Sequence, residues 1–540
     1  MISSKILFFF DILKRAYAFT SRYRAVNIAI ICSLSFLYLL PLAMKNITDP
    51  DFWADEIGTF WAAKGIWQYG PPLSAEGNLW DVFYVNYIQD ITPVGFHVLL
   101  RIFLLLGSSP IVLRTLPFIF LVLSIFLLTR ICYIWYPKKI LNWLGGFVLL
   151  WGSLQKFYAF ELRPYSMEMF SVLVALYISY RRDLIFNNKK IAFIYSVFLS
   201  ICLLSRYSAV ISIAPLFFLL FFDIIAKRQS INRHSLGSIV LFGIPLFITA
   251  LYNVIIVLHQ VPSLTTPYAL EFTFKGGGLD SILLGHKEIL LFPLILLTIL
   301  FIFLRNTERF KRYNTFVIYA LCQNGIFIIL SLLGKYPWGL NSRFDIATNT
   351  IFIVSIIPLL FILLEYFSKQ YIIKLCIVLV LLIVPFLATF NYIRIPGDSF
   401  ASCRADKPIR GDTTYYNYIA SDIKPTSKIL ANFWASSTLR YLFEYGRLRG
   451  VSDYPDNLFF FDFDGNIYPS RKLTTIYLPQ HGFKFKGDII GTVAHNLDDF
   501  DYVILDYHCD IDRIRVWNNK INLWQDITRK GSSVMFKKEN

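Results

Sequence analysis

Four carboxylates lie within eight residues, just after the first long hydrophobic run: Asp49, Asp51, Asp55 and Glu56. Carboxylates next to hydrocarbon are costly and are rare there unless they have a function. A carboxylate at a membrane boundary can act as a general base, because partial burial favours its protonated form. Asp49 and Asp51 also have an Asp-x-Asp metal-binding spacing, although these aspartates could simply cap a helix. We take Asp55 as the strongest candidate for a base.

Further polar clusters interrupt the apolar sequence. One runs from Asp90 to His97, where a capped helix start is the plain alternative, and a second begins at Glu161. A third cluster lies in 335–343, where anchoring in the membrane interface is the alternative. Arginine can hold a phosphate bidentately, and lysine adds a point charge. The candidate phosphate-binding residues are Arg163, Arg206, Lys335 and Arg343. Asp90 could assist Asp55 as a base. The candidate substrate contacts are His97, Glu161, Tyr165 and Tyr336.

The elements that position these clusters are apolar helices. The chain has 540 residues, of which 56% are hydrophobic, and many runs approach the length that crosses a bilayer. We therefore expect a polytopic α-helical membrane protein with about 11 transmembrane helices. The expected spans are 25–44, 111–134, 139–156, 164–180, 190–205, 207–225, 236–258, 288–304, 314–333, 345–364 and 371–390. The short apolar segment 93–106 is expected to be a re-entrant or membrane-surface helix.

The basic residues indicate the orientation of these helices. The net charge is +16, yet residues 391–540 hold 20 Lys+Arg and 18 Asp+Glu and so contribute only +2. The remaining positive charge gathers in short loops between apolar runs, as expected for cytoplasmic loops and for contact with anionic lipid. Membrane lipids are therefore the expected partners of this charge, and nucleic acid is not.

Three regions follow from this topology. Residues 1–24 would form a cytoplasmic interfacial N-terminus, 25–390 the transmembrane catalytic domain with its first external loop at 45–92, and 391–540 a small extracytoplasmic α/β domain. Strand-like runs at 428–434, 501–506 and 532–536 support that last assignment. Cys403 and Cys509 both fall in this region and could form a disulfide if it lies outside the cytoplasm.

Five motifs occur in a fixed order along residues 25–390: Asp55-Glu56, Asp90-Ile-Thr-Pro-Val-Gly-Phe, Leu113-Arg114-Thr-Leu-Pro117, Arg163-Pro-Tyr-Ser166, and Tyr336-Pro-Trp-Gly339 with Arg343. Together they resemble the GT-C superfamily of membrane glycosyltransferases. The nearer relatives are protein O-mannosyltransferase-like enzymes and bacterial aminoarabinose transferases that modify lipid A. The chain departs from the family pattern at Val94, where a second proline is usual, and at Thr92, where histidine is common.

The resemblance implies an enzyme that takes a sugar from a polyprenyl-phosphate carrier on the outer face of the membrane. It would pass a hexosyl or pentosyl group to a hydroxyl of a lipid, glycan or protein, with inversion. Asp55 would be the base, with Glu56 or Asp90 assisting, and no cofactor or essential metal is expected. The composition is typical of an AT-rich bacterial genome, which places the protein in a bacterial inner membrane.

Three alternatives from other classes stay open. A lipid-linked-sugar transporter or flippase would show paired halves and ionisable groups near mid-membrane, and no internal repeat is visible. A glycan polymerase would carry its arginines in one large external loop. A non-catalytic membrane scaffold would leave the outer carboxylates without a role, so that alanine at Asp55 would be harmless.

Overall fold

The computed structural model describes most of the helical part of the chain and the strands of its C-terminal part. The described residues are 24–47, 52, 54–65, 77–88, 92–136, 139–226, 233–264, 288–333, 345–366, 371–390, 426–432, 439, 441, 458–461, 467–469, 500–506, 524–526 and 533–538.

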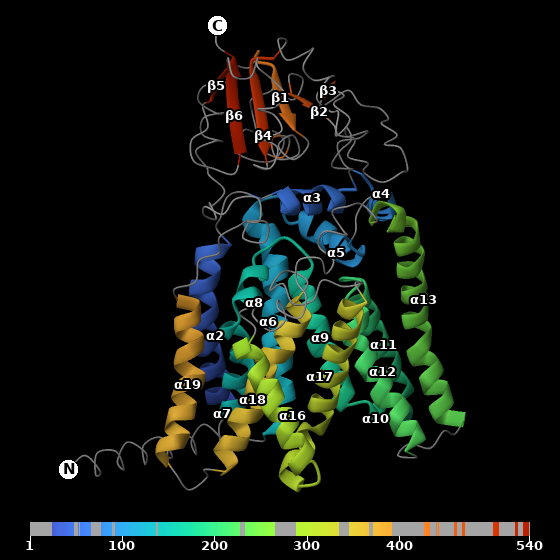
Figure 1. The fold of residues 1–540 in the computed structure, drawn as a ribbon, viewed down its shortest axis with the longest axis vertical. Coiled ribbons are helices and arrows are strands. Elements are labelled where there is room, and N and C mark those ends of the chain that lie inside the picture. Colours follow the sequence, from blue (N-terminus) through green and yellow to red (C-terminus); the bar gives the residue numbers. More distant parts are fainter. Residues whose placement is uncertain are drawn as a thin grey trace, which may run out of the picture.

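Long helices run roughly side by side and form the body of the molecule (Figure 1). They are α2 (Arg24–Asn46), α6 (Pro110–Trp135), α9 (Tyr165–Tyr180), α11 (Lys189–Leu203), α12 (Ala209–Ile225), α13 (Arg233–Leu264), α16 (Glu288–Leu304), α17 (Glu308–Leu332), α18 (Ile346–Tyr366) and α19 (Tyr371–Phe390). The first and last of these pack together, and the Tyr38 hydroxyl donates to the Leu382 carbonyl at 3.0 Å. The last long helix, α19, thus packs against the first, α2, before the chain continues into its C-terminal part.

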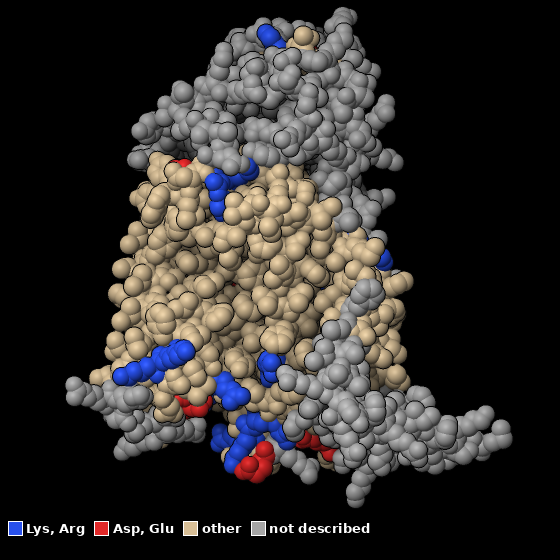
Figure 2. Space-filling model, turned by 180° about the vertical axis from the view of Figure 1, so that it is seen from behind, with Lys and Arg blue, Asp and Glu red and all other residues tan. Residues whose placement is uncertain are grey.

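Within the described part of the chain, four helices are long and apolar enough to cross a membrane. They are Pro110–Trp135, Ser235–His259, Phe310–Leu330 and Ile346–Tyr366, and shorter apolar helices accompany them. Large apolar side chains, such as Phe247 and Phe303, face outward from the bundle. Figure 2 shows a broad band nearly free of charged side chains, with most of the visible Lys and Arg along its lower edge. Exposed apolar surface of this extent marks a membrane face. The protein is therefore a polytopic helical membrane protein, and the count of eleven spans stays a prediction.

The expected span 139–156 is wrong as a single helix. The segment divides into α7 (Lys139–Phe147), the 3₁₀ helix η1 (Val148–Trp151) and α8 (Ser153–Tyr158). The break falls at Gly152, whose backbone is extended at φ −74° and ψ 131°. A Cβ atom at Gly152 would lie 1.8 Å from Gln155 Oε1 and 2.4 Å from Ile353 Cδ1 of α18, so a larger residue would require these side chains to move. The break allows the chain after α8 to turn toward the candidate site.

Short helices lie across one end of the bundle, which we call the α3–α5 end: α3 (Ala54–Ala63), α4 (Leu79–Ile88) and α5 (Gly95–Leu104). Ten residues of α-helix are about 15 Å long, so α5 is too short to span a bilayer. The Gly95 amide donates to the Leu204 carbonyl at 3.0 Å, which docks the start of α5 on the end of α11. Arg101 then holds the first loop, donating to the carbonyls of Lys64 at 3.0 Å and Gly77 at 2.5 Å.

At the end of the bundle opposite the α3–α5 end, α10 (Asp183–Asn187) links α9 to α11. The ends of α6, α9 and α17 meet there. Trp135 Nε1 donates to the Tyr180 hydroxyl at 2.6 Å, and Arg312 Nη1 donates to the Trp135 carbonyl at 2.7 Å. Ion pairs Arg182–Asp223 and Arg312–Glu365 also lie at this end. We call it the basic end.

The C-terminal part forms a six-stranded sheet in the order β3-β2-β1-β4-β6-β5. Its strands are β1 (Ile429–Asn432), β2 (Leu458–Phe461), β3 (Ile467–Pro469), β4 (Tyr502–Asp506), β5 (Trp524–Asp526) and β6 (Ser533–Lys538). β1 pairs in parallel with β2 and β4, while the remaining neighbours pair antiparallel. Three strand ranges expected from sequence are confirmed. The helices of an α/β domain would fall mostly outside the described residues, so that assignment stays a prediction.

Two apolar clusters hold these parts together. The larger one fills the bundle between the long helices. The smaller one lies at the α3–α5 end and joins side chains of α3, α5 and α6 to Leu439, Tyr441 and Tyr502 of the C-terminal part. The C-terminal part therefore packs directly on the α3 helix that carries Asp55 and Glu56.

Candidate active site

A fully buried ion pair fixes the α3 helix at the centre of the candidate site. Both Glu56 and Arg114 have side chains with 0% exposure. Arg114 donates Nε to Glu56 Oε1 at 3.1 Å and Nη2 to Glu56 Oε2 at 2.7 Å. The Leu162 amide adds a third hydrogen bond, to Glu56 Oε1 at 2.9 Å. Glu56 therefore ties together α3, α6 and the turn that precedes α9.

This arrangement sets the role that Glu56 can play. Both of its oxygens accept hydrogen bonds from protein donors, and a bidentate pair with arginine is among the strongest that a carboxylate makes. A general base needs an oxygen that can reach the acceptor hydroxyl. The geometry of Glu56 is that of a positioning residue, and it holds the backbone of its neighbour Asp55 in place.

A second cluster places two guanidinium groups around one aromatic ring. Arg163 Cζ lies 5.8 Å from the centroid of the Tyr165 ring, and Arg206 Cζ lies 4.7 Å from it. Arg163 Nη1 also donates to the Thr59 hydroxyl of α3 at 3.1 Å. The structure thus brings Arg206 next to Arg163 and Tyr165, which lie about 40 positions earlier in the sequence. It also joins the arginine pair to the helix that carries Asp55.

Arg206 has a buried carboxylate partner. Its Nη1 lies 2.6 Å from Glu168 Oε2, and the Glu168 side chain has 0% exposure. The Ser208 hydroxyl donates to the other Glu168 oxygen. Glu168 therefore balances the charge of Arg206.

The other predicted residues fall into three groups. His97 on α5 and Glu161 before α9 are buried at 1% exposure, below the surface of the α3–α5 end. Asp55 belongs to α3, and its side chain is not among those described. The remaining predicted residues lie outside the described part of the chain: Asp90, Lys335, Tyr336, Arg343, Cys403 and Cys509.

Two charged residues of this site, Arg114 and Glu168, have no site role in the sequence-based prediction. The signal was present, because each is a charged residue within an otherwise apolar helix. Ionisable residues inside membrane helices usually pair with one another and mark functional regions. Their partners, Glu56 and Arg206, lie 58 and 38 residues away along the chain, so no local spacing could have revealed the pairs.

Aromatic residues cover the Glu56–Arg114 pair. The Arg114 guanidinium lies 5.2 Å from the centroid of the Phe52 ring, and Phe52 lies 5.0 Å from Tyr441. The Tyr441 hydroxyl donates to the Ser108 carbonyl at 3.2 Å. The C-terminal part thus reaches the loop before α6 and shields the ion pair from water, which strengthens it.

The described residues contain no group of three or more His, Cys, Asp or Glu side chains that could hold a metal ion. Asp49 and Asp51, the two residues of the Asp-x-Asp spacing, lie outside the described residues. The absence of an essential metal therefore stays an expectation.

Comparison with known proteins finds similarity in three-dimensional structure alone. No protein-family model matches the sequence, and no curated protein matches it. The structure is similar to the apo state of ArnT from Cupriavidus metallidurans, with a TM-score of 0.53 and 10% identity over 96% of this chain and 98% of that one. It is also similar to an oligosaccharyltransferase, AglB from Archaeoglobus fulgidus, solved with an inhibitory peptide and a dolichol-phosphate.

For AglB the TM-score is 0.50 and the identity 13%, over 92% of this chain and 71% of that one. A second structure of the Archaeoglobus fulgidus oligosaccharyltransferase, a complex with Zn and sulfate, gives a TM-score of 0.50 at 14% identity, over 91% and 69% of the two chains. These likenesses cover nearly all of the present chain and concern its fold. The chain therefore shares its fold with ArnT and with the archaeal oligosaccharyltransferase, which is the fold expected from the resemblance of its sequence motifs.

Proposed function

We propose that this protein is a glycosyltransferase that moves a sugar from a polyprenyl-phosphate carrier to a hydroxyl acceptor. The observation that carries the proposal is the Glu56–Arg114 pair, with its third bond to Leu162. It holds the acidic α3 helix beside a turn that carries Arg163. A base and a phosphate-binding cation are the two groups that such a transfer needs.

Asp55 is the proposed general base. The acceptor hydroxyl must lose its proton as it attacks the anomeric carbon, and a positioned base typically contributes about 10²- to 10⁴-fold. Attack from the face opposite the leaving phosphate gives inversion at that carbon. Asp55 immediately precedes the pinned Glu56 on α3, so its backbone position is set by buried contacts.

Arg163 is the proposed principal contact for the leaving phosphate. Its Nη1 donates to the Thr59 hydroxyl, which fixes the guanidinium group beside the helix that carries Asp55. Arg206 stands on the same Tyr165 ring but shares its charge with Glu168. We propose that Arg206 contributes mainly by raising the positive electrostatic potential near Arg163. Lys335 and Arg343 are the remaining proposed phosphate-binding residues.

The fold likeness supports a lipid-linked donor. The AglB structure is a complex with an inhibitory peptide and a dolichol-phosphate. In this chain the acceptor would be a lipid, a glycan or a protein, and the sugar a hexose or a pentose. We propose that the bundle at 25–390 performs the transfer in a bacterial inner membrane, with residues 391–540 extracytoplasmic.

The test is a donor screen in membranes that contain the full-length protein. A set of radiolabelled sugars on undecaprenyl phosphate is supplied, and label in lipid, glycan and protein fractions is measured. We expect transfer from at least one carrier, with free undecaprenyl phosphate as the second product. Carrier-linked sugar that changes sides of sealed vesicles without being released from its phosphate would support a flippase instead.

A further inference from the structure

A polar hollow lies at the basic end of the bundle, away from the candidate active site. It has a volume of about 370 Å³ and is lined by residues of α6 and α9: Arg130, Tyr133, Ile134, Tyr177, Tyr180 and Arg181. Ligand-binding pockets in proteins commonly begin at about 300 Å³. Arg130 lies 16 residues beyond Arg114 on α6, a helical rise of about 24 Å, so the hollow is separate from the proposed transfer site.

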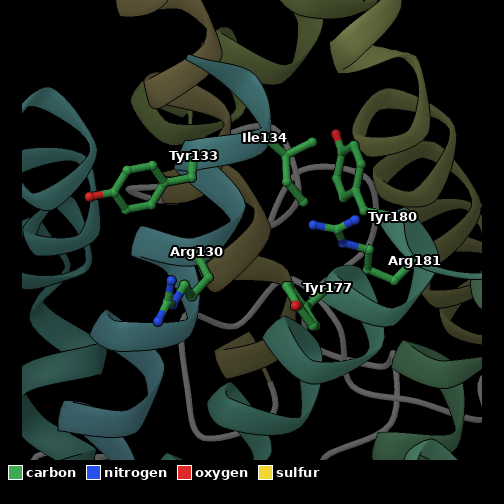
Figure 3. Close-up of a pocket in the computed structure, with 6 residues that line it drawn as sticks. All are labelled: Arg130, Tyr133, Ile134, Tyr177, Tyr180 and Arg181. Carbon is green, nitrogen blue, oxygen red and sulfur yellow. The ribbon is translucent and has the colours of Figure 1, made fainter. Parts of the chain in front are cut away.

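Two arginines flank this hollow. Figure 3 shows Arg130 from α6 and Arg181 from α9 on opposite sides of it, with Arg181 pointing toward Ile134 and Tyr177 below. Both arginines are exposed. Within the described part of the chain neither joins an ion pair: Asp223 pairs with Arg182, Glu365 with Arg312 and Glu308 with Lys311, and the exposed Asp183 of α10 forms no ion pair there. The hollow therefore carries positive charge on two sides.

The wall of the hollow is rigid. The Tyr180 hydroxyl accepts from Trp135 Nε1 at 2.6 Å and donates to the Arg312 carbonyl at 3.2 Å. These bonds fix the end of α9 against α6 and α17. Arg130 and Arg181 thus extend from helix ends that are held together by hydrogen bonds. Such preorganisation lowers the entropy cost of binding one ligand between the two side chains.

The hollow is also next to the lipid-facing surface. Arg130 Cζ lies 5.1 Å from the centroid of the Phe126 ring, and Phe126 is 45% exposed on the apolar face of α6. The exposed guanidinium group of Arg130 thus lies directly against an exposed aromatic ring, at the border between polar and apolar surface. A ligand in the hollow could therefore keep an anionic group at the arginines and hydrocarbon chains beside Phe126.

We infer that this hollow binds the phosphate headgroup of an anionic membrane lipid, held between Arg130 and Arg181 with its acyl chains along the outer face of α6. Arginine is suited to the phosphate because its planar fork donates two parallel hydrogen bonds. Basic pockets between membrane helices on the cytoplasmic side are typical sites for such headgroups. The lipid would anchor the basic end while transfer proceeds at the α3–α5 end.

The test is native mass spectrometry of the full-length protein in detergent with phosphatidylglycerol or phosphatidylcholine of matched acyl chains. The protein with R130Q and R181Q together is compared with wild type and with R305Q, which removes an exposed arginine from the same end outside the hollow. Each charge-assisted hydrogen bond lost corresponds to roughly tenfold in affinity. We expect the double variant to bind its first phosphatidylglycerol at least about tenfold more weakly, with R305Q unchanged.

Three results would overturn the inference. Equal retention of phosphatidylglycerol in all three proteins would show that the arginines do not hold it. Equal binding of phosphatidylcholine by wild type would remove the requirement for an anionic headgroup. Complete displacement by excess inorganic phosphate would show a site for soluble phosphate rather than for lipid. Y177F keeps the ring and removes one hydroxyl, so a loss of affinity by a smaller factor in this variant would support the same site without removing an arginine.

Discussion

Glu56 and Arg114 form a two-point ion pair, at 2.7 and 3.1 Å, in which neither side chain is exposed. Desolvating two charges costs several kcal/mol each, so such a pair is not retained for stability alone. Its consequence is geometric, because it fixes the acidic α3 helix to α6 and to the turn at Leu162.

Breaking this pair from one side should be strongly destabilising. In Arg114→Met the Glu56 carboxylate stays buried without its cation, which typically costs about 3–5 kcal/mol. Thermal unfolding in detergent measures the loss. The matched control is Lys311→Met, since Lys311 and its partner Glu308 are exposed and such pairs contribute at most about 1 kcal/mol. Equal effects of the two substitutions would contradict the buried pair.

The double variant Glu56→Gln with Arg114→Met should recover part of that loss, because it leaves no buried charge behind. The recovered part is the coupling energy of a double-mutant cycle, which for contacting residues is about 0.5–3 kcal/mol. Additive effects would show that the two residues act independently.

The Thr59 hydroxyl should matter for transfer through Arg163. Thr59→Val keeps the side-chain shape but removes the acceptor that Arg163 Nη1 contacts at 3.1 Å. We expect a transfer rate reduced by about tenfold at saturating donor, corresponding to one hydrogen bond to a charged group. Thr115→Val is the control, because its hydroxyl contacts only the Ile111 carbonyl on the exposed side of α6.

Glu168 should set the orientation of Arg206. In Glu168→Gln the side chain keeps its shape but loses the charge that Arg206 contacts at 2.6 Å. We expect weaker folding, by about 1.5–3 kcal/mol, together with a lower KM for the donor, since the cation is then free to attract phosphate. Unchanged donor KM with unchanged stability would show that this pair has no part in the site.

Tyr441 should hold the C-terminal part against α3. Tyr441→Ala removes the ring that stacks on Phe52 and Phe60 and the hydroxyl that contacts Ser108. Loss of a large buried side chain costs about 3–5 kcal/mol. We therefore expect proteolysis to separate residues 391–540 from the bundle faster in this variant. Cleavage at the wild-type rate would contradict the packing of Tyr441 on α3.

The helices of the bundle could be predicted from the sequence because long apolar runs have few alternatives in a membrane. Ranges such as 25–44 and 371–390 agree with α2 and α19 within a few residues. The break at Gly152 was not predicted, and one of the side chains that fill the space beside this glycine, Ile353 of α18, lies 201 positions away and leaves no local pattern.

The candidate site, like the fold, could be predicted from the sequence only in part. Local motifs placed Glu56, Arg163 and Arg206 near one end of the bundle, because each lies where an apolar run begins or ends. They did not separate the roles of these residues. That separation comes from partners on other helices: Arg114 for Glu56, Thr59 for Arg163 and Glu168 for Arg206. Burial and pairing follow from tertiary packing, which single-sequence spacing does not record.

The most direct test of the account compares Asp55→Asn with Asp51→Asn in the purified full-length protein, using the carrier-linked sugar identified in the donor screen. Both substitutions remove one carboxylate from the same acidic run. We predict that Asp55→Asn lowers the rate of transfer by about 10²-fold or more, the typical contribution of a general base, with donor binding retained, and that Asp51→Asn stays near the wild-type rate. Transfer by Asp55→Asn at the wild-type rate would contradict the account.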